Sequence, residues 1–121
     1  MGIPLLICDD SNMARKQVTR SLPDGWDVDI TYAVNGVEGI EAVRQGHAEM
    51  LFLDLTMPEM DGYEVLELIK QEAHKSFVIV ISGDIQPEAR ERVLKLGALE
   101  FIKKPINKEK LGNVLQMYGL I

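Results

Sequence analysis

The sequence predicts one doubly wound α/β domain over residues 1–121, with a parallel sheet of five strands covered by helices on both faces. Short apolar runs alternate five times with longer segments of helical period. Strictly alternating β and α elements favour a parallel sheet joined by right-handed crossovers. The chain has 121 residues, 46% of them hydrophobic, which is enough to bury a core without disulfides.

The predicted strands are short apolar segments that end at polar residues. Three of them are almost entirely apolar, as expected for strands covered on both faces. They are residues 4–8, 50–53 and 77–81, and a short further strand is predicted at residues 99–102. The segment from Val28 to Tyr32 alternates apolar and polar residues instead. This period of two indicates a half-exposed strand at an edge of the sheet.

Helices are predicted between the strands, where apolar residues recur every three or four positions. They are residues 11–22, residues 36–45, the segment around Val65, the segment from Pro87 to Leu96 and the segment around Leu111. Pro87 is expected in the first turn of its helix, where its missing N–H costs nothing. Gly97 is expected as the C-terminal cap of the same helix.

Composition and charge exclude several function classes. Thirteen Lys and Arg against nineteen Asp and Glu give a net charge of −6, and an acidic chain without a basic run is a poor candidate for direct nucleic-acid binding. The single cysteine, Cys8, excludes an internal disulfide and a multi-cysteine zinc site. No segment approaches the roughly 20 apolar residues of a membrane span, and none resembles a targeting signal. We therefore expect a soluble, cytoplasmic protein without nucleic-acid or membrane partners.

Charged and hydroxyl residues stand where four of the predicted strands end. They are Asp9 and Asp10 after the first strand, Asp54 after the third, Ser82 after the fourth and Lys104 after the fifth. In an open parallel sheet, ligands bind outside the carboxyl ends of the strands. We therefore expect these carboxylates, the hydroxyl and the lysine to converge on one edge of the sheet.

A cluster of carboxylates predicts a divalent cation. Two carboxylates about 5 Å apart repel each other by roughly 3 kcal/mol at an effective dielectric constant of about 20. Oxygen ligands favour Mg²⁺, Mn²⁺ or Ca²⁺ over zinc, and too few protein oxygens are present to fill a calcium shell. Mg²⁺ is therefore the predicted metal, with Mn²⁺ as a substitute. Asp9, Asp10 and Asp54 would hold it, and the backbone carbonyl of Thr56 would add an oxygen.

Asp54 is the predicted nucleophile, because it ends the central strand. A carboxylate beside Mg²⁺ and a lysine can attack phosphorus and form an aspartyl phosphate. Lys104 would neutralise one phosphoryl oxygen, and the Ser82 hydroxyl would hydrogen-bond another.

Together these motifs resemble the receiver domains of two-component response regulators, in particular the small chemotaxis type. The resemblance covers essentially the whole chain. Its motifs are Asp9-Asp10, the run from Leu53 to Gly62, Ser82-Gly83, Gly97-Ala98 and Lys104-Pro105. It implies a flavodoxin-like (βα)5 fold with strand order 2-1-3-4-5 and a cis peptide before Pro105. It also implies Mg²⁺-dependent phosphoryl transfer to Asp54 from a phosphohistidine on a sensor histidine kinase or a phosphotransfer protein.

Phe101 falls where the family carries an aromatic switch residue. The resemblance implies that phosphorylation draws the Ser82 hydroxyl toward the phosphoryl group and that the Phe101 ring turns inward behind it. The surface of the fourth helix, fifth strand and fifth helix would then bind a downstream protein, and a phosphatase could act on the phosphorylated form. The alternative is that Phe101 is only a core residue. We expect a signalling domain that promotes its own phosphorylation and dephosphorylation, not a conventional turnover enzyme.

Three other interpretations share parts of this pattern. A phosphohydrolase of the haloacid-dehalogenase type also uses a strand-end aspartate, but Thr56 stands where its second aspartate is needed. A flavodoxin-like cofactor binder would need a phosphate-binding loop where Asp9 and Asp10 would repel phosphate. The third is a receiver-like module that has lost phosphorylation, against which the complete set of site residues argues.

Overall fold

The computed structural model describes residues 2–84 and 86–121, and its sheet has the strand order β2-β1-β3-β4-β5. The strands are β1 (Ile3–Cys8), β2 (Val28–Ala33), β3 (Met50–Leu53), β4 (Phe77–Ser82) and β5 (Glu100–Lys103). Every neighbouring pair is parallel. The order and the pairing confirm the predicted fold class, and β2 lies at an edge as its alternating pattern indicates.

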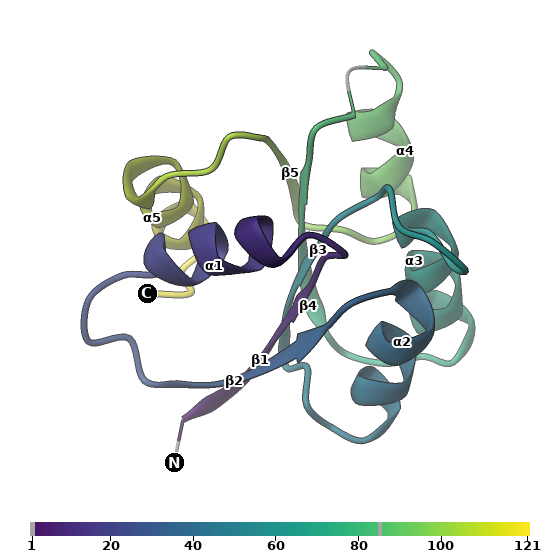
Figure 1. The fold of residues 1–121 in the computed structure, drawn as a ribbon, viewed down its shortest axis with the longest axis horizontal. Helices are drawn as coiled ribbons and strands as arrows, with labels where there is room; N and C mark the ends of the chain where they lie inside the picture. The colour runs from purple at the N-terminus through teal and green to yellow at the C-terminus, as the bar shows by residue number, and fades with distance from the viewer. Residues whose placement is uncertain (1, 85) are drawn as a thin grey trace.

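The helices follow the strands in alternation. They are α1 (Asn12–Arg20), α2 (Gly36–Arg44), α3 (Gly62–Gln71), α4 (Ala89–Lys95) and α5 (Lys108–Met117). Figure 1 shows α1 and α5 on one face of the sheet and α2, α3 and α4 on the other. Side-chain oxygens cap four helix N-termini by accepting a backbone N–H three residues ahead. The capping residues are Ser11, Asn35, Asp61 and Asn107.

The two ends of α4 compare differently with the prediction. The helix begins at Ala89, whose N–H donates to the carbonyl of Gln86. Pro87 therefore lies in a tight turn ahead of the helix and not in its first turn. At the other end, Gly97 has a φ of +105° directly after the capping residue Leu96, which confirms its predicted role.

An apolar cluster lies on each face of the sheet, and the two share no side chains. One cluster joins alternate residues of the central strands to α2, α3 and α4, and the other joins the remaining strand residues to α1 and α5. Phe52 and the leucines of β1 and β3 are fully buried. The central strands therefore form a firm platform, and the residues at their carboxyl ends are held at one edge.

In the part of the chain that the structure describes, no helix has the length and apolarity needed to cross a membrane.

Candidate functional site at the carboxyl edge of the sheet

The three predicted carboxylates lie together at the carboxyl edge of β1 and β3. One oxygen from each of Asp9, Asp10 and Asp54 lies within 4.8 Å of the others. Asp9 and Asp54 are buried, with 3% and 5% of their surface exposed, whereas Asp10 is exposed. The N–H of Asp54 donates to the carbonyl of Cys8 over 3.0 Å, which aligns the ends of the two strands.

Lys104 reaches these carboxylates from the segment that joins β5 to α5. Its Nζ lies 2.8 Å from Oδ2 of Asp9 and 3.6 Å from Oδ1 of Asp54. The backbone N–H of Lys104 donates to the carbonyl of Ser82 over 2.9 Å, which fixes the lysine relative to β4. The peptide between Lys104 and Pro105 is cis, as the family resemblance implies.

Burial and charge together set the electrostatics of the site. Burial raises the pKa of Asp54 above its ordinary value, the charge of Asp9 raises it further, and Lys104 opposes both effects. For Lys104, burial alone would lower the pKa, but the hydrogen bond to Asp9 and the charges of both carboxylates raise it above its ordinary value. Three carboxylates therefore face one ammonium group, and the excess negative charge favours binding of a cation.

The donors of this cluster fit Mg²⁺. They are carboxylate oxygens, which hard divalent cations prefer, and the exposure of Asp10 leaves room for the water ligands that Mg²⁺ retains. Thr56, predicted to add its carbonyl, is exposed at the rim. It lines one hollow together with Asp54, Gly83, Asp84, Gln86 and Lys104.

Ser82 and Phe101 lie on the two strands beside this hollow. Ser82 is fully buried at the end of β4, and its Oγ accepts the backbone N–H of Asp84 over 3.2 Å. Phe101 is half-buried on β5 and packs against the apolar cluster beneath α2, α3 and α4. This position is compatible with a core residue and with a switch residue, so the switch role stays a prediction.

Two residues that form hydrogen bonds with Asp9 are not among the site residues predicted from the sequence. The N–H of Ser11 donates to Oδ1 of Asp9 over 2.9 Å, and Nη1 of Arg15 donates to the Asp9 carbonyl over 2.7 Å. Ser11 is the N-cap of α1, and Arg15 lies in the first turn of that helix. A serine directly before a predicted helix is a cap signal that the sequence offers, whereas no local pattern marks the contact of Arg15 with the carbonyl of Asp9.

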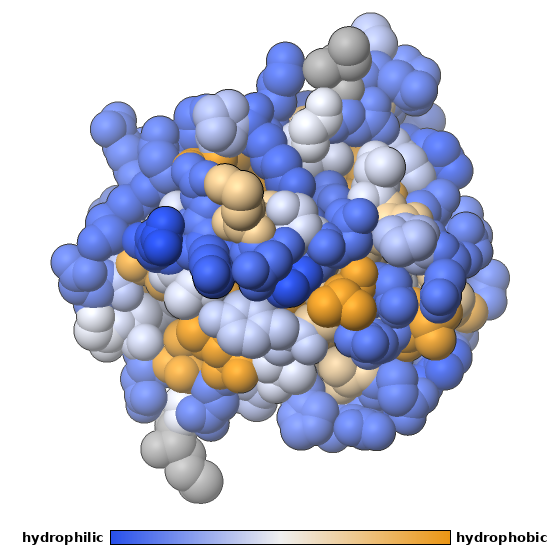
Figure 2. Space-filling view, viewed as in Figure 1, coloured by the Kyte–Doolittle hydropathy of each residue, from blue (hydrophilic) through white to orange (hydrophobic). Residues whose placement is uncertain are grey.

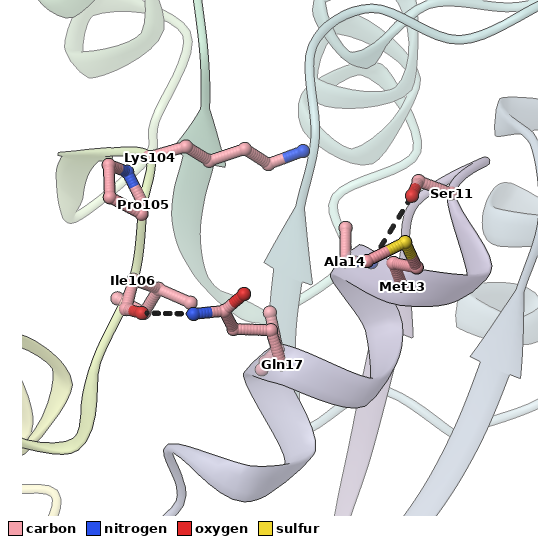
Figure 3. A pocket seen from close by; sticks show the side chains of 8 residues that line it. Ser11, Met13, Ala14, Gln17, Lys104, Pro105 and Ile106 are labelled. Carbon is pink, nitrogen blue, oxygen red and sulfur yellow. Dashed lines mark hydrogen bonds between the residues drawn. The ribbon is translucent and has the colours of Figure 1, made fainter.

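A second hollow adjoins Lys104 between α1 and the segment before α5. Figure 3 shows Ser11, Met13, Ala14 and Gln17 on one side of it and Lys104, Pro105 and Ile106 on the other. The amide of Gln17 donates to the carbonyl of Ile106 over 3.0 Å and joins the two walls. Met13 is 81% exposed. The face that carries α1 is otherwise largely hydrophilic, with separate hydrophobic patches (Figure 2).

This fold and this acidic edge define a class of protein, and comparison with known proteins agrees. The response regulator receiver domain model matches residues 5–116, and the chain belongs to that family, which consists of two-component signalling modules. The chain is 36% identical over 111 residues to the chemotaxis protein CheY of Treponema pallidum, covering 88% of this chain and 76% of that protein.

Two further comparisons bear on the site and on chain length. The structure of the CheX–CheY–BeF3–Mg²⁺ complex from Borrelia burgdorferi matches with a TM-score of 0.85 and 28% identity, covering 98% of this chain and 90% of that one. Protein-glutamate methylesterase/protein-glutamine glutaminase 3 of Geobacter sulfurreducens is 36% identical over 104 residues, which are 85% of this chain and 28% of the relative. The chain thus spans less than a third of the length of that enzyme.

Proposed function

We propose that Asp54 accepts a phosphoryl group in a Mg²⁺-dependent reaction, with a phosphohistidine of a sensor kinase or phosphotransfer protein as the donor. The convergence of Asp54 with Asp9, Asp10 and Lys104 carries this proposal. Membership of the receiver domain family supports it. The Borrelia complex contains CheX, BeF3 and Mg²⁺ together with CheY, and it supports a protein partner and a metal at this kind of site.

The arrangement of the side chains supports an in-line transfer of the phosphoryl group to Asp54. A carboxylate oxygen of Asp54 attacks the phosphorus, the new P–O bond forms, the P–N bond breaks, and the imidazole leaves with the electron pair. Asp9, Asp10 and Asp54 would hold Mg²⁺, which when bound offsets charge on the phosphoryl oxygens. Lys104 lies 3.6 Å from Asp54 and would pair with one of these oxygens.

The phosphorylated form is expected to recruit the Ser82 hydroxyl to another phosphoryl oxygen. Phe101 lies on the strand beside Ser82, because β4 and β5 are paired. A shift at Ser82 can therefore reach Phe101 and the surface of α4, β5 and α5. We propose that this surface then binds a downstream protein and that a phosphatase can reverse the modification.

The hollow beside Lys104 is the proposed contact area for the phosphodonor protein. It opens directly next to the lysine, and Met13 offers an exposed apolar side chain on its rim. A partner bound over α1 and the segment before α5 would hold its phosphohistidine close to Asp54.

Incubation with acetyl phosphate tests the acceptor chemistry without a protein partner. We expect the intact mass to rise by one phosphoryl group with Mg²⁺ present, and not with a chelator. Asp54→Asn should abolish the change. Asp29→Asn is the matched control, because Asp29 is an exposed aspartate of β2. Phosphorylation of Asp54→Asn to the same extent as the wild type would refute the proposal.

A further inference from the structure

A row of side chains connects α4 to the loop after Ser82. The guanidinium carbon of Arg92 lies 3.7 Å from the centroid of the Tyr63 ring. The Tyr63 hydroxyl donates to Oδ2 of Asp84 over 3.3 Å. The backbone N–H of Asp84 in turn donates to Oγ of Ser82 over 3.2 Å. The proposed function assigns no role to Tyr63 or Arg92.

The position of Tyr63 is fixed by the start of α3, close to the proposed acceptor Asp54. It lies in the first turn of α3 and is only 9% exposed. The preceding residue, Gly62, donates its N–H to the carbonyl of Leu55 over 2.9 Å, which ties the start of the helix to the residue after Asp54. Burial and the neighbouring charge of Asp84 raise the pKa of Tyr63, so its hydroxyl keeps its proton and remains a donor.

Asp84 connects Tyr63 to the candidate site. Its side chain lines the same hollow as Asp54 and Lys104. Both of its carboxylate oxygens are engaged, Oδ2 by Tyr63 and Oδ1 by the N–H of Gln86 over 2.9 Å. The hydrogen bond from Tyr63 therefore fixes the orientation of a carboxylate at the edge of the site, and through it the backbone that contacts Ser82.

We propose that Tyr63 is a positioning residue for the loop after Ser82. Its hydrogen bond to Asp84, with Arg92 stacked on the ring, holds this loop in the unphosphorylated arrangement. The inference rests on the proposed function, in which the Ser82 hydroxyl turns from its contact with Asp84 toward a phosphoryl oxygen. A contact that exists in only one of two states favours that state by its own free energy. The Tyr63–Asp84 hydrogen bond therefore opposes the response to phosphorylation.

The affinity for beryllium trifluoride in the presence of Mg²⁺, measured by calorimetric titration, tests this proposal. Tyr63→Phe keeps the ring and its contact with Arg92 and removes only the hydroxyl. We expect it to tighten binding about threefold to tenfold, the range for the loss of one hydrogen bond from the competing state. Asp84→Ala should also tighten binding, and adding Tyr63→Phe to it should have no further effect. Tyr32→Phe is the matched control, because the Tyr32 hydroxyl pairs with Thr19 on the other face of the sheet; its affinity should equal that of the wild type.

The amide resonances of Ser82 and Asp84 in the unmodified protein provide a second measurement. Tyr63→Phe should shift them, because the hydrogen bond that fixes Asp84 is lost, while Tyr32→Phe should not. Unchanged or weaker binding of beryllium trifluoride by Tyr63→Phe, or equal effects of that change in the presence and absence of Asp84, would overturn the inference. If the wild type binds no beryllium trifluoride, the proposed function fails instead, and unshifted amides in Tyr63→Phe then overturn the contact itself.

Discussion

Gly62→Ala is expected to damage both the fold and the candidate site, because Gly62 is packed directly against the backbone of Asp54, the proposed acceptor. A Cβ on this residue would collide with the carbonyl oxygen of Asp54 and would lie 2.8 Å from Cα of Leu55. Real Cβ atoms essentially never approach other heavy atoms within 3.0 Å. Both obstacles belong to the backbone of buried residues, so they cannot turn aside as a flexible side chain would.

The cost can be estimated from the packing. Forcing an extra carbon into a well-packed interior costs about 1–3 kcal/mol. Each kcal/mol lowers the thermal midpoint by roughly 3–6 °C in a domain of this size. The displaced group is the backbone of Asp54, so phosphorylation by acetyl phosphate should also slow in the fraction that remains folded.

Gly112→Ala supplies the matched control. Gly112 lies inside α5 with nothing within 4 Å of the position that its Cβ would take. Alanine there should stabilise the helix by about 0.5–1 kcal/mol. Urea unfolding of both variants measures the two effects. The packing argument is refuted if Gly62→Ala is as stable as the wild type, or if the two substitutions change stability in the same direction.

Three further outcomes are expected. The hydrogen bond from Arg44 lowers the pKa of Glu72 from 4.5 to about 2. The ionised Glu72 carboxylate therefore stabilises the fold fully above pH 4.5, and this stabilisation is lost as the pH falls toward 2. Glu72→Gln should be less stable than the wild type at neutral pH, and the difference between their urea midpoints should become smaller below pH 4.5. A difference that does not change with pH would contradict this. Burial raises the pKa of Cys8 to about 12, so the thiol should react with a disulfide reagent only after unfolding, and rapid labelling of the native protein would be the opposing result. Met13→Glu should slow transfer from a phosphorylated histidine phosphotransfer protein and not from acetyl phosphate, while Met117→Glu, on the exposed side of α5, should change neither; equal rates for both variants would exclude the proposed docking area.

Much of the fold could be predicted because the relevant signals are local. The apolar run of β3 indicates a strand that is covered on both faces, and the alternation of apolar and polar residues in β2 indicates a strand that is covered on one face. The candidate site was predictable for a related reason: Asp9 and Asp54 directly follow strands, and parallel strands bring their carboxyl ends to one edge. A residue that directly follows a parallel strand can therefore be placed at the carboxyl edge of the sheet from the sequence alone.

Contacts between side chains of different helices and loops could not be predicted in this way. Tyr63 and Asp84 are 21 residues apart, and their hydrogen bond depends on how α3 packs beside the loop after β4. The start of α4 was misplaced for a similar reason, because Pro87 suits a tight turn as well as a first helical turn. The preference of the residue alone does not decide between them.

The most direct test of the central claim is to locate the modified residue. After incubation with acetyl phosphate and Mg²⁺, reduction with borohydride converts an aspartyl phosphate to homoserine, which peptide mass spectrometry can assign to one position. We predict homoserine at position 54 and at no other aspartate. Homoserine elsewhere, or a phosphoryl group on a histidine or serine with Asp54 unmodified, would contradict the account.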